Sequence, residues 1–417
     1  MNMETQHGMM DDNRSKLPLA GIRVADFTWI GAGSYTTKLL ADFGADIIKI
    51  ETSTHLDTLR ETAPFRDGMA GVNRSGYFAD RNASKRSMTL NLKHPKAAAL
   101  ARRLIAKCDI VANNFTPGTM DRLGLGYNDI KAIKRDIIYL SMSMQGGTGP
   151  HAGYVGFGLT IGALAGLHHL SGPVERPPAG TATNYPDHVP NPCHAAFALL
   201  AALFHRRKTG EGQYIDFAQT EPTIDLLSTA VIDYTVNGRV AERNGNRQPD
   251  AIVHGVYRCK GEDRWIAISA YEDAQWQALV AVLQLPPSLR DWCDAGTREQ
   301  YADELDALLG TYTVRHDARE LMTTLQAHGV AAGMVQNARD LVEDDPQLKH
   351  RAHWVTLQHP EMGACLYNSP PAQLGETPAH LTRPAPLLGQ HTREICCDLL
   401  ELDDVEYAQF DREGVFE

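Results

Sequence analysis

The sequence contains little cysteine, no excess of positive charge and no long hydrophobic segment. Its 417 residues include 7 cysteines at irregular spacings, which argues against a disulfide framework, and no Cys-x-x-Cys metal signature. The neighbouring Cys396 and Cys397 are interpreted as structural. The formal net charge of −11 argues against a general nucleic-acid binder, although it is compatible with a local basic pocket for an anionic ligand.

The longest apolar run extends from Ala195 to Phe204 and has about half the length of a membrane-spanning helix, so no membrane span is expected. Residues 1–16 are polar and lack the apolar core of a signal peptide, so we expect them to form a flexible tail. With 43% hydrophobic and 22% charged residues, the composition is that of an ordinary globular protein. These features predict a cytoplasmic protein that binds neither membranes nor nucleic acids.

Segments typical of strands alternate with segments typical of helices over residues 17–236. Strands are predicted at 22–27, 46–50, 109–112, 137–141 and 213–217. Helices are predicted at 34–43, 95–107, 156–170 and 221–236. A basic segment at 82–93 leads into a further strand. This alternation predicts an α/β fold in which a large Rossmann-like domain contains a doubly wound parallel sheet.

The pattern changes after Asn237-Gly238, and a polar linker is predicted at 237–250. A small α+β domain is predicted at 251–350, with a strand hairpin at 254–260 and 264–269, helices at 272–284, 297–309 and 316–328, and a strand at 330–335. The segment 351–417 is expected to return to the large domain, with a helix beginning within 386–395. The large domain would then be built from both ends of the chain.

Two glycines follow the first predicted strand, in Gly31-Ala-Gly33, and Glu51 stands eighteen residues beyond the second of them. This arrangement is part of the fingerprint of dinucleotide-binding domains. The third glycine of the fingerprint is absent, because Thr36 takes its place. A turn between strand and helix needs small residues in any α/β fold, so no nicotinamide or flavin site is predicted.

A proline-rich segment, Thr183 to Pro192, precedes the most apolar helix predicted in the chain. Its prolines hold the segment out of regular structure, so Asp187 is expected on a rigid loop. Asn191 and Pro192 are predicted to cap and begin the helix, which is apolar on nearly every face, as in a helix buried inside a large domain. A carboxylate ahead of a helix N-terminus ionises easily and can act as a nucleophile. The alternative is a turn residue that bonds its own backbone.

Seven segments of motif character stand along the chain. They are Gly44-Ala-Asp-Ile-Ile-Lys-Ile-Glu51, Lys85-Arg-Ser87, Asn114-Phe115-x-Pro-Gly118, Gln145-Gly-Gly-Thr-Gly-Pro150, Tyr185-Pro-Asp187, Lys208-Thr-Gly-Glu-Gly-Gln213 and Pro386-Leu-Leu-Gly-Gln-His-Thr392. In this order they resemble the class III CoA-transferases, a family that includes formyl-CoA transferase, carnitine CoA-transferase and bile acid CoA-transferases. The resemblance covers nearly the whole chain, from Pro18 to Ile395.

The resemblance implies that Asp187 is the catalytic nucleophile and that no metal takes part. The carboxylate would attack a donor thioester to give a mixed anhydride, and CoA thiolate would convert it to an aspartyl-CoA thioester. An acceptor acid would then leave as its CoA ester. A fixed carboxylate can serve as such a temporary acyl carrier. Backbone N–H groups of residues 145–149 or 31–33 are candidates for binding the developing oxyanion.

The resemblance also implies a binding site for CoA, which is a substrate and not a tightly bound cofactor. Its adenine and pantetheine would contact Ile30, Leu90 and Phe115, and its ribose and phosphates would contact Lys93, Asn114 and Arg122. Leu90 can instead be a plain core residue. An interlocked homodimer is implied as well.

The chain departs from formyl-CoA transferase near the expected acyl site. Gly31 replaces a glutamine, Thr52 replaces an arginine, and the glycine-rich lid of the second domain is missing. These differences argue against oxalate as the acceptor. With Trp29 and Gly31 near the site, a medium-sized or bulky carboxylate is expected, with succinyl-CoA as a candidate donor.

Two other functions are compatible with parts of the sequence. The α-methylacyl-CoA racemases resemble the same family and move an α-proton with a histidine and an aspartate, the histidine lying in a His-Asp-x-x-Tyr segment. That motif is absent after Pro150, although His151 stands nearby, so a racemase or epimerase acting on an acyl-CoA is the alternative. A non-enzymatic CoA-binding role would leave Asp187 incidental.

Overall fold

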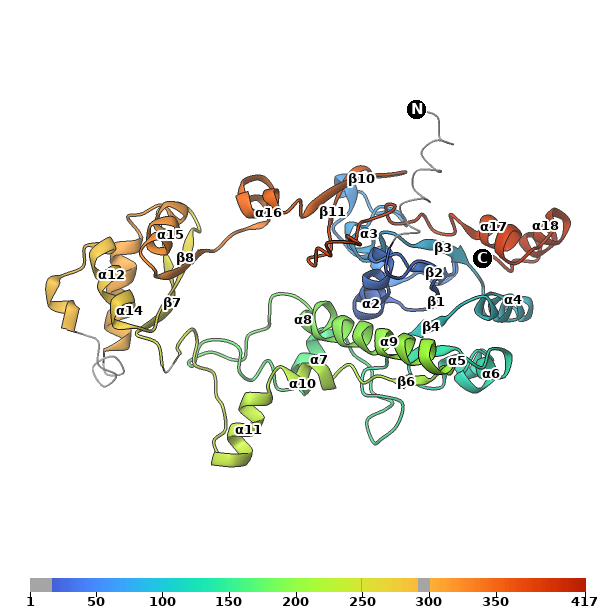
Figure 1. Ribbon diagram of the computed structural model, residues 1–417, viewed down its shortest axis with the longest axis horizontal. Coiled ribbons are helices and arrows are strands. Elements are labelled where there is room, and N and C mark those ends of the chain that lie inside the picture. Colours follow the sequence, from blue (N-terminus) through green and yellow to red (C-terminus); the bar gives the residue numbers. More distant parts are fainter. Residues whose placement is uncertain (1–16, 249, 292–300) are drawn as a thin grey trace. The chain divides into compact units, whose positions relative to one another are not determined.

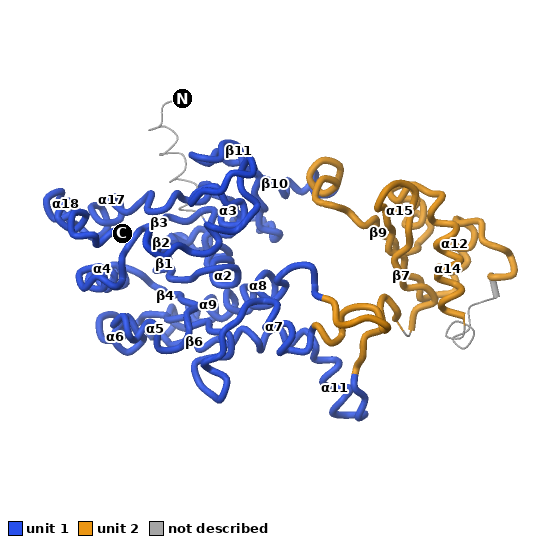
Figure 2. The backbone as a smooth tube through the Cα atoms, turned by 180° about the vertical axis from the view of Figure 1, so that it is seen from behind, with its two compact units in different colours: residues 1–167, 180–240, 347–417 blue, residues 168–179, 241–346 orange. Residues whose placement is uncertain are grey.

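The computed structural model describes residues 17–248, 250–291 and 301–417, which form two compact units (Figure 2). Unit 1 contains the chain up to residue 167 together with residues 180–240 and 347–417, and unit 2 contains residues 168–179 and 241–346. The tail predicted at 1–16 lies outside the described residues. The domain boundaries given by the sequence analysis stay predictions.

Unit 1 is built on a six-stranded parallel sheet in the order β3-β2-β1-β4-β5-β6 (Figure 1). Its strands are β1 (Arg23–Asp26), β2 (Asp46–Glu51), β3 (Arg86–Thr89), β4 (Ile110–Asn113), β5 (Ile138–Ser141) and β6 (Tyr214–Asp216). The strand order reverses between β1 and β4, which is the doubly wound arrangement. The predicted α/β fold class is confirmed.

Helices cover both faces of this sheet. The helices of this part of unit 1 are α2 (Ile30–Asp42), α3 (Gly76–Asn82), α4 (Pro95–Ala106), α5 (Thr119–Arg122), α6 (Tyr127–Ile133), α7 (Gly158–Leu164), α8 (Tyr185–His188), α9 (Pro190–Thr209), α10 (Glu221–Asp225) and α11 (Ser228–Asn237), with short 3-10 helices η1 (Thr58–Glu61) and η2 (Arg66–Gly68). Because side chains alternate along a strand, Ile48 of β2 packs with Leu104 of α4, while Ile47 packs with Leu40 of α2 and Leu199 of α9.

The C-terminal segment packs against β3 at the edge of the sheet. After α16 (Pro346–His350) it contains the antiparallel strands β10 (Trp354–His359) and β11 (Gly363–Asn368), then α17 (Thr392–Glu394), the π-helix η5 (Ile395–Leu399) and α18 (Asp404–Arg412). The Thr89 N–H donates to Thr392 Oγ1 at 3.0 Å, and the Asn91 N–H donates to the Val415 carbonyl at 2.9 Å. The hairpin of β10 and β11 was missed by the sequence analysis, which expected only that 351–417 returns to the large domain with a helix beginning within 386–395.

Unit 2 has its own core around an antiparallel sheet in the order β7-β8-β9. Its elements are β7 (Val253–Arg258), β8 (Trp265–Ala270), α12 (Asp273–Leu283), the 3-10 helix η3 (Pro287–Asp291), α14 (Ala302–Thr313), α15 (Ala318–Ala327), β9 (Ala331–Met334) and the π-helix η4 (Asp340–Asp344). The predicted hairpin is confirmed. The helix predicted from residue 297 begins at Ala302 in the structure, and 297–300 lie outside the described residues.

Two helix starts differ from the prediction, and both lie close to the expected site. Helix α2 begins at Ile30, so Gly31 and Gly33 lie in its first turn and not in a separate turn. Helix α9 begins at Pro190, which places Asn191 inside the helix with a fully buried side chain that caps nothing. The predicted cap at Asn191 was therefore wrong, because Pro190 already has a φ that suits the first residue of a helix.

Candidate active site

Asp187 lies in the short helix α8 and is almost fully buried, with 4% of its surface exposed. Its Oδ2 accepts a hydrogen bond from the Gly158 N–H, at the start of α7, at 3.1 Å. Burial raises the pKa of this carboxyl to about 6, and the bond from Gly158 lowers it by less. The predicted loop was wrong, because Asp187 lies in α8. The predicted easy ionisation was wrong as well, because the loss of water raises the pKa more than the nearby donor lowers it.

Two glycines make room for this carboxylate. A Cβ atom at Gly31 would lie 3.1 Å from the Asp187 Cβ, and one at Gly158 would lie 3.0 Å from Asp187 Oδ2 and 2.7 Å from the Asn184 Cβ. Contacts under 3.0 Å are essentially never seen for real Cβ atoms. Any larger residue at Gly158 would thus displace Asn184 or crowd the Asp187 carboxylate.

Asp187 opens into a cavity of about 540 Å³ at the carboxyl ends of the parallel strands. This is where ligands bind in doubly wound sheets, next to the reversal of strand order. The cavity is lined by Phe27, Trp29, Ile30, Gly31, Ala32, Ile50, Glu51, Thr52, Thr54, His55, Leu90, Asn91, Leu92, Lys93, Asn114, Phe115, Thr116, Pro117, Thr119, Leu123, Ser143, Met144, Tyr154, Val155, Gly156, Phe157, Asp187 and Gln219.

Five of the six residues expected to bind CoA line this cavity, namely Ile30, Leu90, Lys93, Asn114 and Phe115. Leu90 has 1% of its surface exposed and also belongs to the core, in keeping with the plain alternative. Arg122 is exposed and does not line the cavity, but it donates to the hydroxyl of Thr119, which does, at 2.9 Å.

Asn114 fixes the backbone at Trp29. Its Oδ1 accepts from the Trp29 N–H at 2.8 Å, and its Nδ2 donates to the Trp29 carbonyl at 2.7 Å. The Trp29 ring meets Phe115 edge-on at 5.7 Å between centroids and His55 at 5.0 Å. Trp29 and His55 line the cavity, although the sequence analysis did not include them among the expected CoA contacts. The aromatic residues that follow β1 and β4 were the sequence signal that could have identified this part of the cavity.

Of the groups suggested for an oxyanion or for proton transfer, Gly147 and His151 have other partners, while residues 31–33 stay a prediction. The Gly147 N–H donates to the Asp216 carboxylate at 2.8 and 3.1 Å. His151 stacks on Tyr154 at 4.5 Å and does not line the cavity. The segment from Tyr154 to Phe157, which the sequence analysis did not select, lines the cavity instead. No observation therefore favours the racemase alternative.

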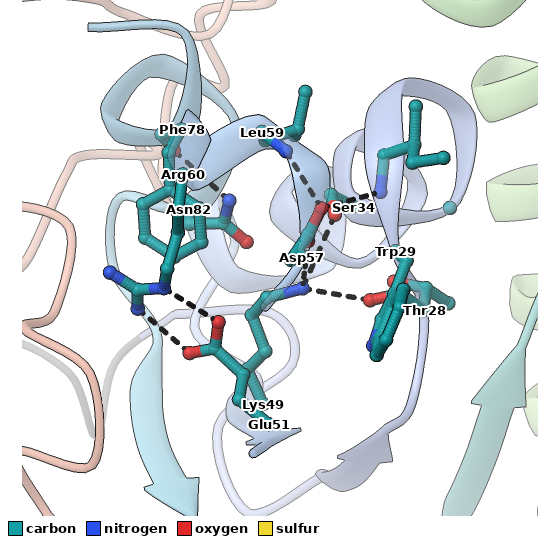
Figure 3. Close-up of polar contacts among 12 residues, drawn as sticks. Thr28, Trp29, Ser34, Lys49, Glu51, Asp57, Leu59, Arg60, Phe78 and Asn82 are labelled. Carbon is teal, nitrogen blue, oxygen red and sulfur yellow. Dashed lines mark hydrogen bonds and ion pairs between the residues drawn. The ribbon is translucent and has the colours of Figure 1, made fainter. Parts of the chain in front are cut away.

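A buried ion pair supports the turn between β1 and α2 (Figure 3). Lys49 and Asp57 are both fully buried, 2.9 Å apart, and Lys49 also donates to the Thr28 carbonyl at 2.7 Å. Asp57 Oδ1 accepts from the N–H groups of Ile30 and Leu59 at 3.1 and 3.0 Å. The pair thus holds Ile30 in a left-handed backbone conformation, with φ 60°. This conformation is unfavourable for a β-branched residue such as isoleucine.

Glu51, the residue that a dinucleotide site would use for a ribose, has other partners. Its carboxylate accepts from Arg60 Nε and Nη2, both at 2.8 Å (Figure 3). It also accepts from the Ser87 hydroxyl at 2.8 Å. The Arg60 guanidinium lies over the Phe78 ring at 3.6 Å from its centroid. This carboxylate is held by partners in the core, and the absence of a dinucleotide site stays a prediction.

Comparisons with known proteins give consistent relatives. The family model described as CoA-transferase family III matches residues 19–392. The succinyl-CoA–D-citramalate CoA-transferase of Chloroflexus aurantiacus is 30% identical over 408 residues, which cover 97% of this chain and 100% of that protein. The succinyl-CoA:glutarate CoA-transferase of Mus musculus is 29% identical over 410 residues, covering 97% and 92%.

A solved structure, that of a CaiB/BaiF family protein from Brucella suis, has a TM-score of 0.84 and 28% identity, covering 92% of this chain and 100% of that one. No helix among the described residues has the length and apolar character needed to cross a membrane. Within the same residues, no group of three His, Cys, Asp or Glu side chains is placed to hold a metal ion.

We expect Asp57→Asn to lower the free energy of unfolding by about 3–5 kcal/mol, because Lys49 is left as a buried charge without its partner. Asparagine keeps an acceptor for the Ile30 N–H, so the loss of stability measures the effect of removing the negative charge alone. Urea unfolding followed by circular dichroism measures it. The control is Glu406→Gln, which removes an exposed pair with Arg103 and should cost below about 1 kcal/mol. Equal losses in the two variants would contradict the role of the buried pair.

The raised pKa of Asp187 predicts that this carboxylate destabilises the fold at neutral pH. An acid whose pKa is raised in the folded state contributes its full stability when it is protonated. The free energy of unfolding is therefore highest below the ordinary pKa of 3.8 and falls as pH rises from there to about 6. We expect Asp187→Asn to raise the free energy of unfolding by about 1–3 kcal/mol at pH 8 and by much less at pH 4. Urea unfolding at both pH values tests this, with Asp411→Asn on the surface as control. A variant less stable than wild type at pH 8 would sink the prediction.

Proposed function

The chain belongs to CoA-transferase family III, and we propose that it moves CoA from a donor acyl-CoA to a carboxylic acid through a covalent intermediate on Asp187. The family membership confirms the resemblance found in the sequence, and it makes the chain a CoA-transferase. The observation that carries the covalent route is the placement of Asp187, buried at a cavity that also contains five of the expected CoA contacts.

The proposed reaction balances without a metal or redox step. An oxygen of the Asp187 carboxylate attacks the donor thioester carbon, and the C–S bond breaks. CoA leaves as thiolate, and a mixed anhydride remains on Asp187. The thiolate attacks the Asp187 carbonyl carbon and releases the donor acid, which leaves an aspartyl-CoA thioester. The acceptor carboxylate attacks the aspartyl-CoA thioester and releases CoA thiolate, which leaves a second mixed anhydride. The thiolate then attacks the acyl carbon of the acceptor, so the acceptor leaves as its CoA ester and the Asp187 carboxylate is restored.

Burial of Asp187 supports its use as the nucleophile. At pH 7 a carboxyl with a pKa of about 6 is roughly nine-tenths ionised, so the reactive form predominates. This carboxylate has lost most of its water and has the Gly158 N–H as its donor, so little solvation has to be removed before it attacks. The same N–H is a candidate donor to the oxyanion that forms at the Asp187 carbonyl.

The cavity walls support the proposed CoA site. The rings of Trp29 and Phe115 offer flat apolar surfaces for the adenine and pantetheine, and the exposed ammonium of Lys93 offers a positive charge at the cavity for a phosphate. Arg122, one turn from the cavity wall at Thr119, remains a proposed phosphate contact.

The acid substrates follow from the relatives. The two curated relatives described above are named for succinyl-CoA together with D-citramalate or glutarate, which are both dicarboxylic acids. We therefore take succinyl-CoA as the donor and a dicarboxylic acid of similar length as the acceptor.

A second copy of the chain is proposed as the partner that covers one side of α9. The sequence of this helix is apolar on nearly every face, yet Phe197, Leu200 and Phe204 are 72%, 43% and 62% exposed. Ile232 and Val236 of α11 are exposed as well, at 59% and 74%. Large apolar side chains exposed in this way are typical of a protein interface. We propose a homodimer that buries them.

Incubation with succinyl-CoA and other acyl-CoAs, followed by hydroxylamine trapping and peptide mass spectrometry, is expected to give a modification at Asp187. The physical reason is that an anhydride or thioester on a carboxylate is an activated acyl group that hydroxylamine captures. Asp187→Ala should lose the adduct and at least about 1,000-fold of transfer activity. Asp411→Ala, an exposed carboxylate on α18, is the control. Full activity of Asp187→Ala would end the covalent proposal.

Sedimentation is expected to show a dimer for the wild type and a monomer for the double variant Phe197→Glu and Phe204→Glu, because two charges would be desolvated in the interface. Val405→Glu on α18, which is 74% exposed, is the matched control and should remain dimeric. A monomeric wild type at micromolar concentration would refute the proposed interface.

A further inference from the structure

Helix α8, which carries Asp187, is a single turn that its own backbone holds only weakly. It contains four residues, Tyr185–His188, and no side chain among the described residues caps its N-terminus. Val189, with φ −124° and ψ −74°, separates it from α9. A helix of one turn has few internal hydrogen bonds, so contacts with neighbouring elements have to set its orientation. The direction of the Asp187 carboxylate depends on those contacts.

Two side chains of α8 form hydrogen bonds with other elements in the part of the chain that the structure describes. One is Asp187 itself, whose Oδ2 accepts from the Gly158 N–H of α7 at 3.1 Å. The other is His188, whose Nδ1 lies 3.0 Å from Arg81 Nη2 and whose Nε2 lies 3.3 Å from the Tyr77 hydroxyl oxygen, both on α3. Of the two anchors, His188 is the one that takes no part in the proposed chemistry.

The bond between His188 and Arg81 requires a neutral imidazole. A guanidinium can only donate, so Nδ1 of His188 is the acceptor. Burial and the positive charge of Arg81 lower the pKa of His188 to about 4, whereas Asp80 raises it by less. The ring is therefore neutral at pH 7 and can accept this hydrogen bond.

Arg81 is held in place independently of α8. Its Nη1 lies 2.8 Å from Asp80 Oδ2, and its guanidinium lies 4.3 Å from the centroid of the Tyr35 ring of α2. Asp80 in turn accepts from the Asn368 amide of β11 at 3.0 Å. Helix α3 thus offers α8 a donor whose position is set by α2 and by the C-terminal segment.

The anchor at His188 determines which way the neighbouring carboxylate faces. Successive residues of an α-helix are turned by about 100° around its axis, so holding one side chain of a single-turn helix fixes the rotation of the others. With His188 held at α3, Asp187 packs against Gly31 of α2 and accepts from Gly158 of α7. A rotation of α8 that broke the contact with Arg81 would turn Asp187 away from Gly158 and admit water to it.

The groups that face Asp187 are neutral. They are Gly31 on α2, Gly158 on α7 and the Tyr77 hydroxyl on α3, whose own pKa is raised by burial and further by the Asp187 charge. His188, beside it on α8, is neutral as well. Burial is the cause that raises the pKa of Asp187, and the bond from Gly158 lowers it. This pKa therefore responds to how much water reaches the carboxylate.

We propose that His188 is a positioning residue: held by Arg81, it fixes the rotation of α8 and keeps the Asp187 carboxylate aligned with Gly158 and shielded from water. The inference rests on the CoA-transferase function proposed above. His188 does not contact the substrate and transfers no proton. It acts through the main chain, on the residue beside it.

Steady-state kinetics of transfer from succinyl-CoA to glutarate tests this role. His188→Ala removes the acceptor for Arg81, and we expect kcat to fall about 10- to 100-fold because the carboxylate is no longer held in line. Affinity for CoA, measured by titration calorimetry, should change less than about twofold, since His188 does not line the cavity. His328→Ala, an exposed histidine at the end of α15, is the matched control. An unchanged kcat in His188→Ala would overturn the inference.

The pH profile gives a readout that a merely destabilised fold does not move. The acid limb of kcat/KM for succinyl-CoA follows the ionisation of Asp187 in the free enzyme, with a midpoint near its pKa of about 6. Water admitted in His188→Ala lowers that pKa toward its ordinary value of 3.8, so the midpoint should move down by about one pH unit. Reduced activity with an unmoved midpoint would contradict the proposal.

A conservative variant and a double-mutant cycle separate positioning from general damage. The Oδ1 of His188→Asn can take the place of Nδ1 and accept from Arg81, so we expect kcat within about threefold of wild type and an acid limb near its original midpoint. Arg81→Leu should resemble His188→Ala, and the double variant should be no worse than the poorer single one, because both remove the same contact. Losses that multiply, or an asparagine variant no better than alanine, would count against the proposal.

Unfolding measurements test the same role without catalysis. The raised pKa of Asp187 predicts that Asp187→Asn stabilises the protein at pH 8. In the His188→Ala background this gain should fall to below about half, because the carboxylate has already recovered water. An equal gain in both backgrounds would refute the positioning role. If wild type transfers nothing and forms no Asp187 adduct, the proposed function fails, whereas the comparison of stabilities still decides whether His188 positions Asp187.

Discussion

The turn from β1 into α2 is held by buried polar groups, and the geometry of the cavity depends on it. Lys49 binds the Thr28 carbonyl, Asp57 binds the Ile30 N–H, and Asn114 binds both backbone groups of Trp29. Burial by itself lowers the pKa of Lys49, but Asp57, together with Glu51 and Asp26, raises it above its ordinary value. The ammonium therefore stays charged, and the turn is fixed by contacts that no ligand has to supply.

This fixed turn brings α2 close to Asp187, the proposed nucleophile. Because Gly31 has no side chain, the first turn of α2 can approach Asp187, and Gly158 allows α7 to donate its first N–H to the same carboxylate. The carboxylate then loses its water, and its pKa rises to about 6. Stability is given up at the position where reactivity is needed, as is common at catalytic sites.

Helix α9 joins the catalytic region to the proposed interface. Its buried side, with Ala195, Leu199 and Ala202, forms part of the core below the sheet, and its N-terminus follows directly after α8. Its opposite side carries exposed Phe197 and Phe204. The apolar character on all sides, which first suggested burial within one chain, is explained by one face packing in the core and the other against a proposed second copy.

The sequence by itself determined the fold class, the strands of the parallel sheet in unit 1, and Asp187 as the candidate nucleophile. Strand and helix periodicities are local, and seven motifs stand in the order of a known family, so these conclusions needed no coordinates. Five of the six expected CoA contacts also line the cavity, because they follow strands whose carboxyl ends meet at one edge.

Only the tertiary structure decided the state and surroundings of the site. The raised pKa of Asp187 comes from burial by segments far apart in the chain, which local sequence does not reveal. The start of α9 at Pro190 and the core position of Glu51 were settled by packing in the same way. Such long-range contacts exist only after the sheet has brought these segments together.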